Sequence, residues 1–220
     1  MSLLRTYGLT SLALLACACS AETGETPPIP MGSIRLINAS SATLSVVVDG
    51  QTQVESLGRA NVSSLIYVSV GSHTVALRTA AGASASLTVS ASLTATVTAV
   101  ALPTGGSSIS ANVIVDTGTI VPAGKSKLRV LHMAAGAQPL EIWRTQPDFH
   151  TPVHIMTPFL YQAQSPYLQS DPGEWEVWVT APNGTTKIAT TGSITVPDGQ
   201  RKTVVLLDSA GVVRFRIIDN

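Results

Sequence analysis

Residues 87–102 read LTVSASLTATVTAVAL, in which Val and Leu alternate with Ser and Thr almost throughout. Leu44, Val46 and Val48 alternate with their neighbours in the same way. Successive side chains of a strand point to opposite faces of a sheet, so this period of two is typical of half-buried strands in an antiparallel sandwich. No helical period of useful length follows the N-terminal segment. The sequence therefore predicts an all-β fold.

Internal similarity indicates two related units. The matching segments are 34–39 with 128–133, 44–47 with 140–143, 70–77 with 172–179, 95–98 with 202–205, and 113–116 with 216–219. Each unit has room for about seven short strands, the size of an immunoglobulin-like domain. We therefore predict two tandem antiparallel immunoglobulin-like β-sandwich domains, over residues 34–118 and 128–220, joined by a hinge at 119–127.

The first residues carry an export signal. Residues 1–16 combine a basic start, a short apolar run and small residues at its end, which predicts a signal peptide that is cleaved off. Residues 14–17 read LLAC and resemble the lipobox of bacterial lipoproteins, in which the Cys thiol carries a diacylglycerol. We predict Cys17 as the lipid-attachment residue, with Cys19 as the alternative; an ordinary cleaved signal with two incidental Cys residues is the other interpretation.

A tether follows the signal. Residues 17–33 are rich in Pro, Thr, Gly and Glu and have no apolar period, which predicts a flexible segment between lipid and domain. Together these features predict an exported protein that its N-terminal lipid holds on a membrane, at the outer membrane or cell surface.

Charge and cysteine content narrow the function classes. Lys plus Arg and Asp plus Glu number 13 each, and only 12% of residues are charged. A nucleic-acid partner would require clustered basic residues, so that class is excluded. Both Cys residues lie in the N-terminal segment, so the domains must be stable without a disulfide.

Several motifs resemble a known family. Residues 129–132 read RVLH and residues 171–177 read DPGEWEV, while the first unit has NAS at 38–40 and VDG at 48–50. This pattern resembles the bacterial family called domain of unknown function 4397, which commonly occurs in tandem on exported proteins. The resemblance covers nearly the whole mature chain, and the second unit is the more divergent copy. It implies a β fold and export, and it implies no activity.

Residues capable of catalysis or metal binding are scattered. The sequence has no nucleophile elbow, phosphate-binding loop, His-Glu-x-x-His helix or paired-Cys zinc motif. Asp148, His150 and His154, with His132 as a fourth ligand, are weak candidates for a divalent-metal site. Three Pro residues in 147–158 indicate a loop that cannot fix ligand directions, so the favoured interpretation is a solvated loop that Phe149, Ile155 and Phe159 pin to the sandwich. We therefore predict no catalytic residue, metal or cofactor.

Two polar positions recur in both units. His132 occupies the position of Asn38, and either side chain can hold a backbone group, so we predict a structural role. Arg35 and Arg129 also recur, which favours a role in the fold, such as an ion pair with Asp116 or Asp219.

The aromatic residues are concentrated in the second unit, where seven of the ten lie between Trp143 and Trp178. If Leu140, Ile142 and Trp175 face inward, strand alternation turns Trp143 and Trp178 outward. Outward Trp side chains can anchor a protein interface or stack on sugar rings. The alternative is that the long insertion or the first domain covers them.

The leading hypothesis is a non-enzymatic cell-envelope lipoprotein with tandem β-sandwich modules that act as spacer and binding unit. Its partner would be an envelope protein or polysaccharide, contacted through Trp143 and Trp178. A carbohydrate-binding module is the alternative, and a hydrolase or metal-dependent activity is third. Retained binding to insoluble glycan would favour the second hypothesis, and a pocket that gathers His132, His150 and His154 would favour the third.

Overall fold

The computed structural model describes residues 28–106, 108–117, 120–137 and 139–220. Every secondary-structure element assigned in these residues is a β-strand. The predicted signal peptide (1–16), Cys17, Cys19 and most of the predicted tether lie outside the described residues. Within the described ranges, no helix is long and apolar enough to cross a membrane. The predicted all-β fold class is confirmed.

The first unit is a sandwich of two four-stranded sheets, with strand orders β4-β1-β7-β8 and β3-β2-β5-β6. Its strands are β1 (Met31–Asn38), β2 (Leu44–Val48), β3 (Gln51–Leu57), β4 (Ile66–Ser69), β5 (Gly71–Thr79), β6 (Ser84–Ala91), β7 (Thr96–Pro103) and β8 (Ile109–Asp116).

The second unit repeats this arrangement, with strand orders β12-β9-β17-β18 and β11-β10-β14-β15 and a two-stranded piece, β13-β16. Its strands are β9 (Ser126–Met133), β10 (Leu140–Thr145), β11 (Pro152–Phe159), β12 (Leu168–Ser170), β13 (Gly173–Trp175), β14 (Val177–Thr180), β15 (Ala189–Thr190), β16 (Ile194–Val196), β17 (Arg201–Ser209) and β18 (Val212–Asp219). Since β1 begins at Met31 and β9 at Ser126, the last residues of the predicted tether and hinge belong to strands.

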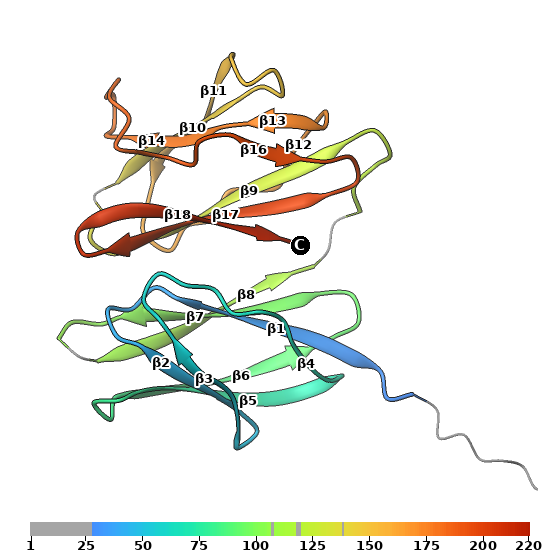
Figure 1. Cartoon of the computed structure of the whole chain (residues 1–220), viewed down its shortest axis with the longest axis vertical. Coiled ribbons are helices and arrows are strands. Elements are labelled where there is room, and N and C mark those ends of the chain that lie inside the picture. Colours follow the sequence, from blue (N-terminus) through green and yellow to red (C-terminus); the bar gives the residue numbers. More distant parts are fainter. Residues whose placement is uncertain (1–27, 107, 118–119, 138) are drawn as a thin grey trace, which may run out of the picture.

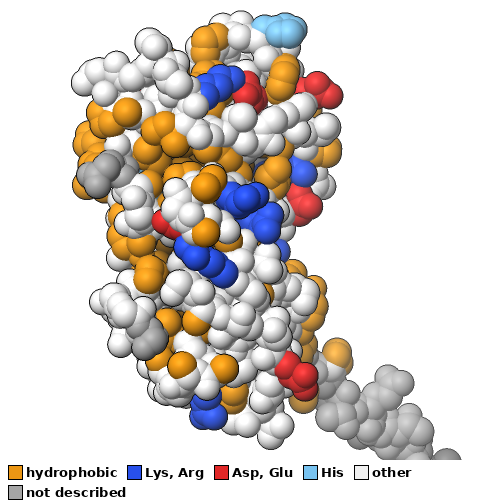
Figure 2. All heavy atoms as spheres, turned by 60° about the vertical axis from the view of Figure 1, so that its left-hand side comes forward, with side chains coloured by type: hydrophobic (Ala, Val, Ile, Leu, Met, Phe, Trp, Pro, Cys, Tyr) orange, Lys and Arg blue, Asp and Glu red, His pale blue; other side chains and the backbone are white. Residues whose placement is uncertain are grey.

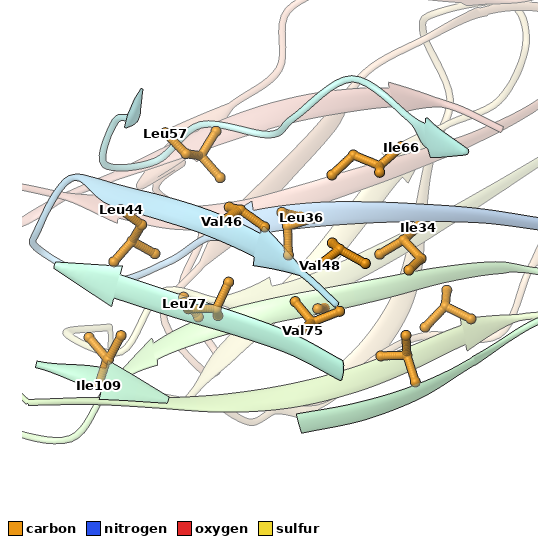
Figure 3. Packing of buried hydrophobic residues seen from close by; sticks show 14 residues of the cluster. Ile34, Leu36, Leu44, Val46, Val48, Leu57, Ile66, Val75, Leu77 and Ile109 are labelled. Atoms are coloured by element: carbon orange, nitrogen blue, oxygen red, sulfur yellow. The ribbon is translucent and has the colours of Figure 1, made fainter. Parts of the chain in front are cut away.

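Each sandwich has its own core, built from alternate residues of facing strands. In the first unit, Ile34 and Leu36 of β1 lie in one cluster with Val46 of β2 and Val75 of β5 (Figure 3). In the second unit the corresponding cluster includes the fully buried Trp175. Burying one Val, Leu or Ile side chain contributes about 1.5–3 kcal/mol, so each cluster is a major source of stability.

One ladder in each unit departs from the predicted antiparallel pattern. β1 runs parallel to β7, and β9 runs parallel to β17, whereas the other ladders are antiparallel. The first strand of each unit therefore pairs with the penultimate strand rather than with its neighbour in sequence. Alternation alone cannot reveal this pairing, because both pairing types have a side-chain period of two.

The two units stack sheet on sheet and form four layers (Figure 1). The sheet that contains β1 and β7 packs against the sheet that contains β9 and β17 through a third apolar cluster. Alternation explains this arrangement: in β17, Val204 and Leu206 enter the second core, whereas Val205 and Leu207 enter the cluster between units. The central strands of both middle sheets, β1 and β7 in the first unit and β9 and β17 in the second, are thus buried on both faces.

Polar contacts also cross between the units. Arg59 donates a hydrogen bond from Nη2 to Asp208 Oδ1 at 2.8 Å, and Arg216 donates to the Ala60 carbonyl at 2.8 Å. Figure 2 shows Lys and Arg side chains gathered at mid-height on this face of the molecule. The units are therefore joined by a broad packed interface in addition to the short connecting segment.

The hairpin between β2 and β3 turns at Asp49 and Gly50, which both have positive φ (48° and 82°). A two-residue turn with two positive φ angles is the type I′ turn that Asp-Gly favours. Asp49 Oδ2 lies 2.6 Å from His73 Nδ1, and the other ring nitrogen lies 2.7 Å from the Ser69 carbonyl. The hydrogen bond with Asp49, followed by the one with Ser69, raises the pKa of His73; the hydrogen bond with His73 lowers the pKa of Asp49.

We expect the stabilisation by this pair to depend on pH. Because the pKa of His73 is raised by folding, its contribution is complete below its usual value of 6.5 and is lost as pH rises through the higher folded value. The contribution of Asp49 is complete above its usual value of 3.8 and is lost as pH falls through the lower folded value. The free energy of unfolding of the wild type should therefore exceed that of His73→Gln by the largest amount between pH 3.8 and pH 6.5. Denaturant titrations across pH would contradict this if the difference grew on the alkaline side.

Candidate functional site

The outer face of the sheet β11-β10-β14-β15 carries a row of cross-strand neighbours. His154 lies opposite Trp143, and Trp143 lies opposite Trp178. The two Trp ring centroids are 6.4 Å apart with planes inclined by 7°, and the His154 ring centroid lies 4.7 Å from that of Trp143. Opposed residues share a face of the sheet, so the three rings form one aromatic strip.

Strand alternation places the strip outside the core, as the sequence predicts. Leu140, Ile142 and Trp175 are all buried in the second core, whereas neither Trp143 nor Trp178 belongs to that cluster. The first unit has Val47 paired with Ala76 at the equivalent register, so it has no such strip.

Trp178 lies beneath a charged side chain. Only 9% of Trp178 is exposed, and Lys187 Nζ lies 4.2 Å from its ring centroid. Both carboxylate oxygens of Glu176 hold this ammonium at 2.8 Å. Burial tends to raise the pKa of Glu176, but hydrogen bonds from Lys187 and Thr190 outweigh it and hold the pKa below its usual value. The loop after β14 therefore covers most of Trp178 with Lys187, and the exposed remainder of this residue lines a hollow beside Trp143.

Trp143 is partly exposed and lines a groove. Two adjoining hollows, of about 460 and about 220 Å³, both include Trp143, Gly184 and Thr185 in their walls. The indole N–H of Trp143 has no hydrogen-bond acceptor among the described residues. We call this feature the Trp143 groove.

Polar groups surround the Trp143 groove. Glu141 and His154 lie in the wall of its larger hollow, together with Asn183. Glu141 accepts a hydrogen bond from the Asn183 backbone N–H at 3.0 Å, which is the main reason that its pKa is lowered. The groove thus combines an aromatic face with an ionised carboxylate and an imidazole.

The sequence did not single out Glu141, Asn183 or Lys187. Residues 182–184 read PNG, which marks a turn after the strand that carries Trp178. A turn motif indicates where the chain bends but not the surface onto which the loop folds.

The weak metal candidates are not brought together. Asp148 accepts hydrogen bonds from the backbone N–H groups of His150 and Thr151, which lower its pKa, whereas His154 lies on the aromatic strip. Among the described residues, no three His, Cys, Asp or Glu side chains are grouped so as to hold a metal ion. Phe159 and Ile155 pack against the second core as predicted, whereas Phe149 does not belong to that cluster. The prediction of a loop is wrong for residues 152–159, which form strand β11 and pair with β10.

His132 is a fully buried residue of the second unit. Its Nδ1 accepts a hydrogen bond from the Ala134 backbone N–H at 3.3 Å, as Asn38 Oδ1 accepts one from Ser40 N at 3.0 Å. The two residues therefore hold the backbone two positions ahead, as predicted. His132 and His154 lie in the core and on the outer face, so the histidines do not form one site.

The recurring Arg residues contact the opposite unit. Arg129 Nη2 lies 3.2 Å from Asp116 Oδ2, which confirms one predicted pairing, although this pair crosses between the units. Arg35 donates to the Asp219 main-chain carbonyl at 3.0 Å and to Asn220 Oδ1 at 2.8 Å. The predicted ion pair of Arg35 is thus replaced by neutral acceptors.

We expect the two Trp residues to differ in their effect on stability. Trp178→Ala should lower the free energy of unfolding by about 2 kcal/mol, less than the about 3–5 kcal/mol of a Trp inside a core, because its ring lies outside the core cluster and beneath Lys187. Trp143→Ala should cost about 1 kcal/mol or less, because this ring is partly exposed. Urea titrations of both variants measure the difference. An equal large loss in both would contradict the view of Trp143 as a surface residue.

Comparisons with known proteins identify a family. The profile of the family described as Domain of unknown function (DUF4397) matches residues 32–143. No curated protein matches the sequence. Among solved structures, the Bacillus anthracis TIE protein is 13% identical with a TM-score of 0.27, over 81% of this chain and 34% of that one. The tip fimbrial protein Mfa3 from Porphyromonas gingivalis is 10% identical with a TM-score of 0.30, over 87% of this chain and 100% of that one. The chain thus spans about a third of the length of the first of these proteins.

Proposed function

Since this chain belongs to the family described as Domain of unknown function (DUF4397), we propose a non-enzymatic binding module of the bacterial cell envelope that makes its contact through the Trp143 groove. The observation that carries this proposal is that Trp143 is partly exposed within a groove. The equivalent positions of the first unit carry no aromatic ring. Trp is enriched among the residues that dominate binding energy.

The N-terminal sequence supports the location. A signal-type segment that ends in LLAC, at residues 14–17, would place a diacylglycerol on Cys17 and hold the module on a membrane. Cys17→Ser should abolish lipid labelling and release the protein into the soluble exported fraction. Unchanged labelling of Cys17→Ser would indicate that Cys19 carries the lipid. A wild type without lipid label would refute the lipid anchor.

The polar groups around the Trp143 groove favour a polysaccharide ligand over an apolar protein surface. The C–H face of a sugar ring can pack on the indole, while its hydroxyls donate to the ionised Glu141 and bond to His154. Aromatic walls with a few placed polar groups are typical of small-ligand sites. A carbohydrate-binding module is therefore the second candidate function.

Binding can be measured with residues 28–220. Co-sedimentation with purified peptidoglycan and capture of detergent-solubilised envelope proteins would be compared for the wild type and Trp143→Ala. Tyr67→Ala is the matched control, because Tyr67 is an aromatic residue of the first unit that is 65% exposed. We expect Trp143→Ala to lower binding at least about tenfold and Tyr67→Ala to leave it unchanged. Equal binding by both variants would refute the Trp143 groove as the contact surface.

A further inference from the structure

The two edge strands of the second sandwich leave a groove between them. β15 and β18 are the last strands of their sheets, so each has one edge without a neighbouring strand. The groove encloses about 540 Å³ and is lined by residues 188–191 on one side and residues 212–217 on the other. We call it the edge groove. Strand edges present backbone N–H and C=O groups that another extended chain can pair with.

The first unit shows why the edge groove opens. There β6 is continuous and lies against β8. In the second unit the same edge is divided into β15 and β16. The residues of this edge that pair with two equivalent positions of the preceding strand are three positions apart in the first unit and four positions apart in the second. The second unit therefore has one extra residue at this edge. Gly192, at φ 65°, lies in this extra turn of chain. A one-residue insertion bends a strand edge, so only the two-residue β15 lies alongside β18 where the first unit has the continuous β6.

The lining of the edge groove is mixed, and most of its apolar side chains come from β18. Val213 and Phe215 of β18 are partly buried against the second core, and Ile217 is 42% exposed. A second hollow, of about 330 Å³, adjoins the groove and shares Ile188 and Val213 with it. Ala137, Pro139 and Pro182 are among the other residues of this end hollow. An extended segment in the groove could therefore place one apolar side chain in the end hollow.

The charge of the edge groove indicates what it would bind. Arg214 and Arg216 are in its lining, and none of its described lining residues is acidic. Arg216 already donates to the Ala60 carbonyl, whereas Arg214 is exposed. In antiparallel self-pairing of β18 centred on Phe215, Arg214 of each copy would oppose Arg216 of the other, and opposed like charges destabilise a sheet. The groove therefore fits an acidic segment better than a second copy of this chain.

We propose that the edge groove binds an extended segment of a partner protein, with apolar residues facing Phe215 and the end hollow and an acidic residue facing Arg214. Its main chain would add a strand to the edge of β18, and side-chain pockets would provide specificity. The site is separate from the Trp143 groove.

Selection from a random decapeptide library displayed on phage, with the full chain as bait, tests the proposal. We expect enriched sequences to alternate apolar and acidic residues. Arg214→Glu and Ile188→Asp should each weaken binding of the enriched, fluorescently labelled peptide about tenfold, because both place a negative charge beside an acidic ligand. The matched controls are Arg78→Glu and Leu93→Asp, at exposed positions of the first unit, which should leave affinity unchanged.

Hydrogen exchange gives a second measurement that needs no variant. Bound peptide should slow exchange of backbone amides in residues 212–217 of the wild type, because strand addition pairs that edge. The proposal would be overturned if no peptide were enriched, if the groove variants and their controls had equal affinity, or if exchange slowed only outside residues 212–217. Dimerisation of the wild type that Ile188→Asp weakens would also overturn it, by making a second copy the occupant. Trp143→Ala should leave peptide affinity unchanged, which separates this test from that of the proposed function.

Discussion

Asp116→Asn is expected to lower the free energy of unfolding by about 3 to 5 kcal/mol. Only 4% of the Asp116 side chain is exposed, and it accepts hydrogen bonds from Arg129 at 3.2 Å and from Tyr167 Oη at 2.6 Å. Arg201 Nη1 lies 3.5 Å from its other carboxylate oxygen. Removing the carboxylate charge would leave Arg129, 8% exposed, buried without its compensating anion. That loss is costly because water cannot replace the anion there.

Guanidinium denaturation of the wild type and Asp116→Asn measures the effect. Asp219→Asn is the matched control, because the Asp219 side chain is 79% exposed and pairs with Lys202 on the surface. The control should change stability by about 0.5 kcal/mol or less. A loss below about 1 kcal/mol in Asp116→Asn would show that the pair is not essential to the interface.

The contacts of Asp116 reveal a symmetry between the units. Arg35 pairs with Thr98 and Arg129 pairs with Thr203 in the parallel ladders. In the next ladders, Thr98 lies opposite Ile114 and Thr203 lies opposite Ile218. Two positions further along the chain are Asp116 and Asn220. The contact of Arg129 with Asp116 is therefore matched by the contact of Arg35 with Asn220, as in an interface between two related subunits.

This register corrects part of the sequence alignment between the units. The sequence matched residues 113–116 with 216–219, which equates Asp116 with Asp219. The ladders instead equate Ile114 with Ile218, and both of these residues lie in the cluster between units. In the ladders, Thr98 and Ile114 are 16 positions apart and Thr203 and Ile218 are 15 apart, so the two hairpins differ in length by one residue and matching the identical Asp residues misplaced the last strand. Residues 95–98 were misaligned with 202–205 for a related reason, since the ladders equate Thr98 with Thr203.

The face of each strand was more predictable than its partner. Alternation correctly placed Ile142 inward and Trp143 outward, because one buried face fixes which side chains point to it. It could not predict that the middle sheets stack, although residues 203–207, TVVLL, lack the polar alternation of a sheet with one wet face. The cover of Trp178 by Lys187 was also beyond prediction, because a side chain nine positions away in sequence reaches it through a loop conformation.

Val205→Asp is expected to lower the free energy of unfolding by about 4 kcal/mol or more. Val205 is fully buried in the cluster between units, where it pairs with Leu131 in the parallel ladder. The substitution loses the burial of one Val side chain, about 1.5 kcal/mol or more, and forces a carboxylate into an apolar contact. Val115→Asp, on β8 at a position that is 52% exposed, is the control and should cost about 0.5 kcal/mol or less.

Two probes distinguish loss of coupling between the units from loss of one core. All three Trp residues lie in the second unit, so their fluorescence reports that unit alone, while far-ultraviolet circular dichroism reports both. The wild type should give coincident transitions, because the interface couples the two cores. In Val205→Asp the fluorescence transition should separate from the dichroism transition.

Fragments 32–118 and 126–220 should each unfold cooperatively, since each has its own core, but they should associate through the exposed apolar face. Coincident transitions in the variant, together with monomeric fragments, would mean that the packed cluster between the units contributes little to their coupling.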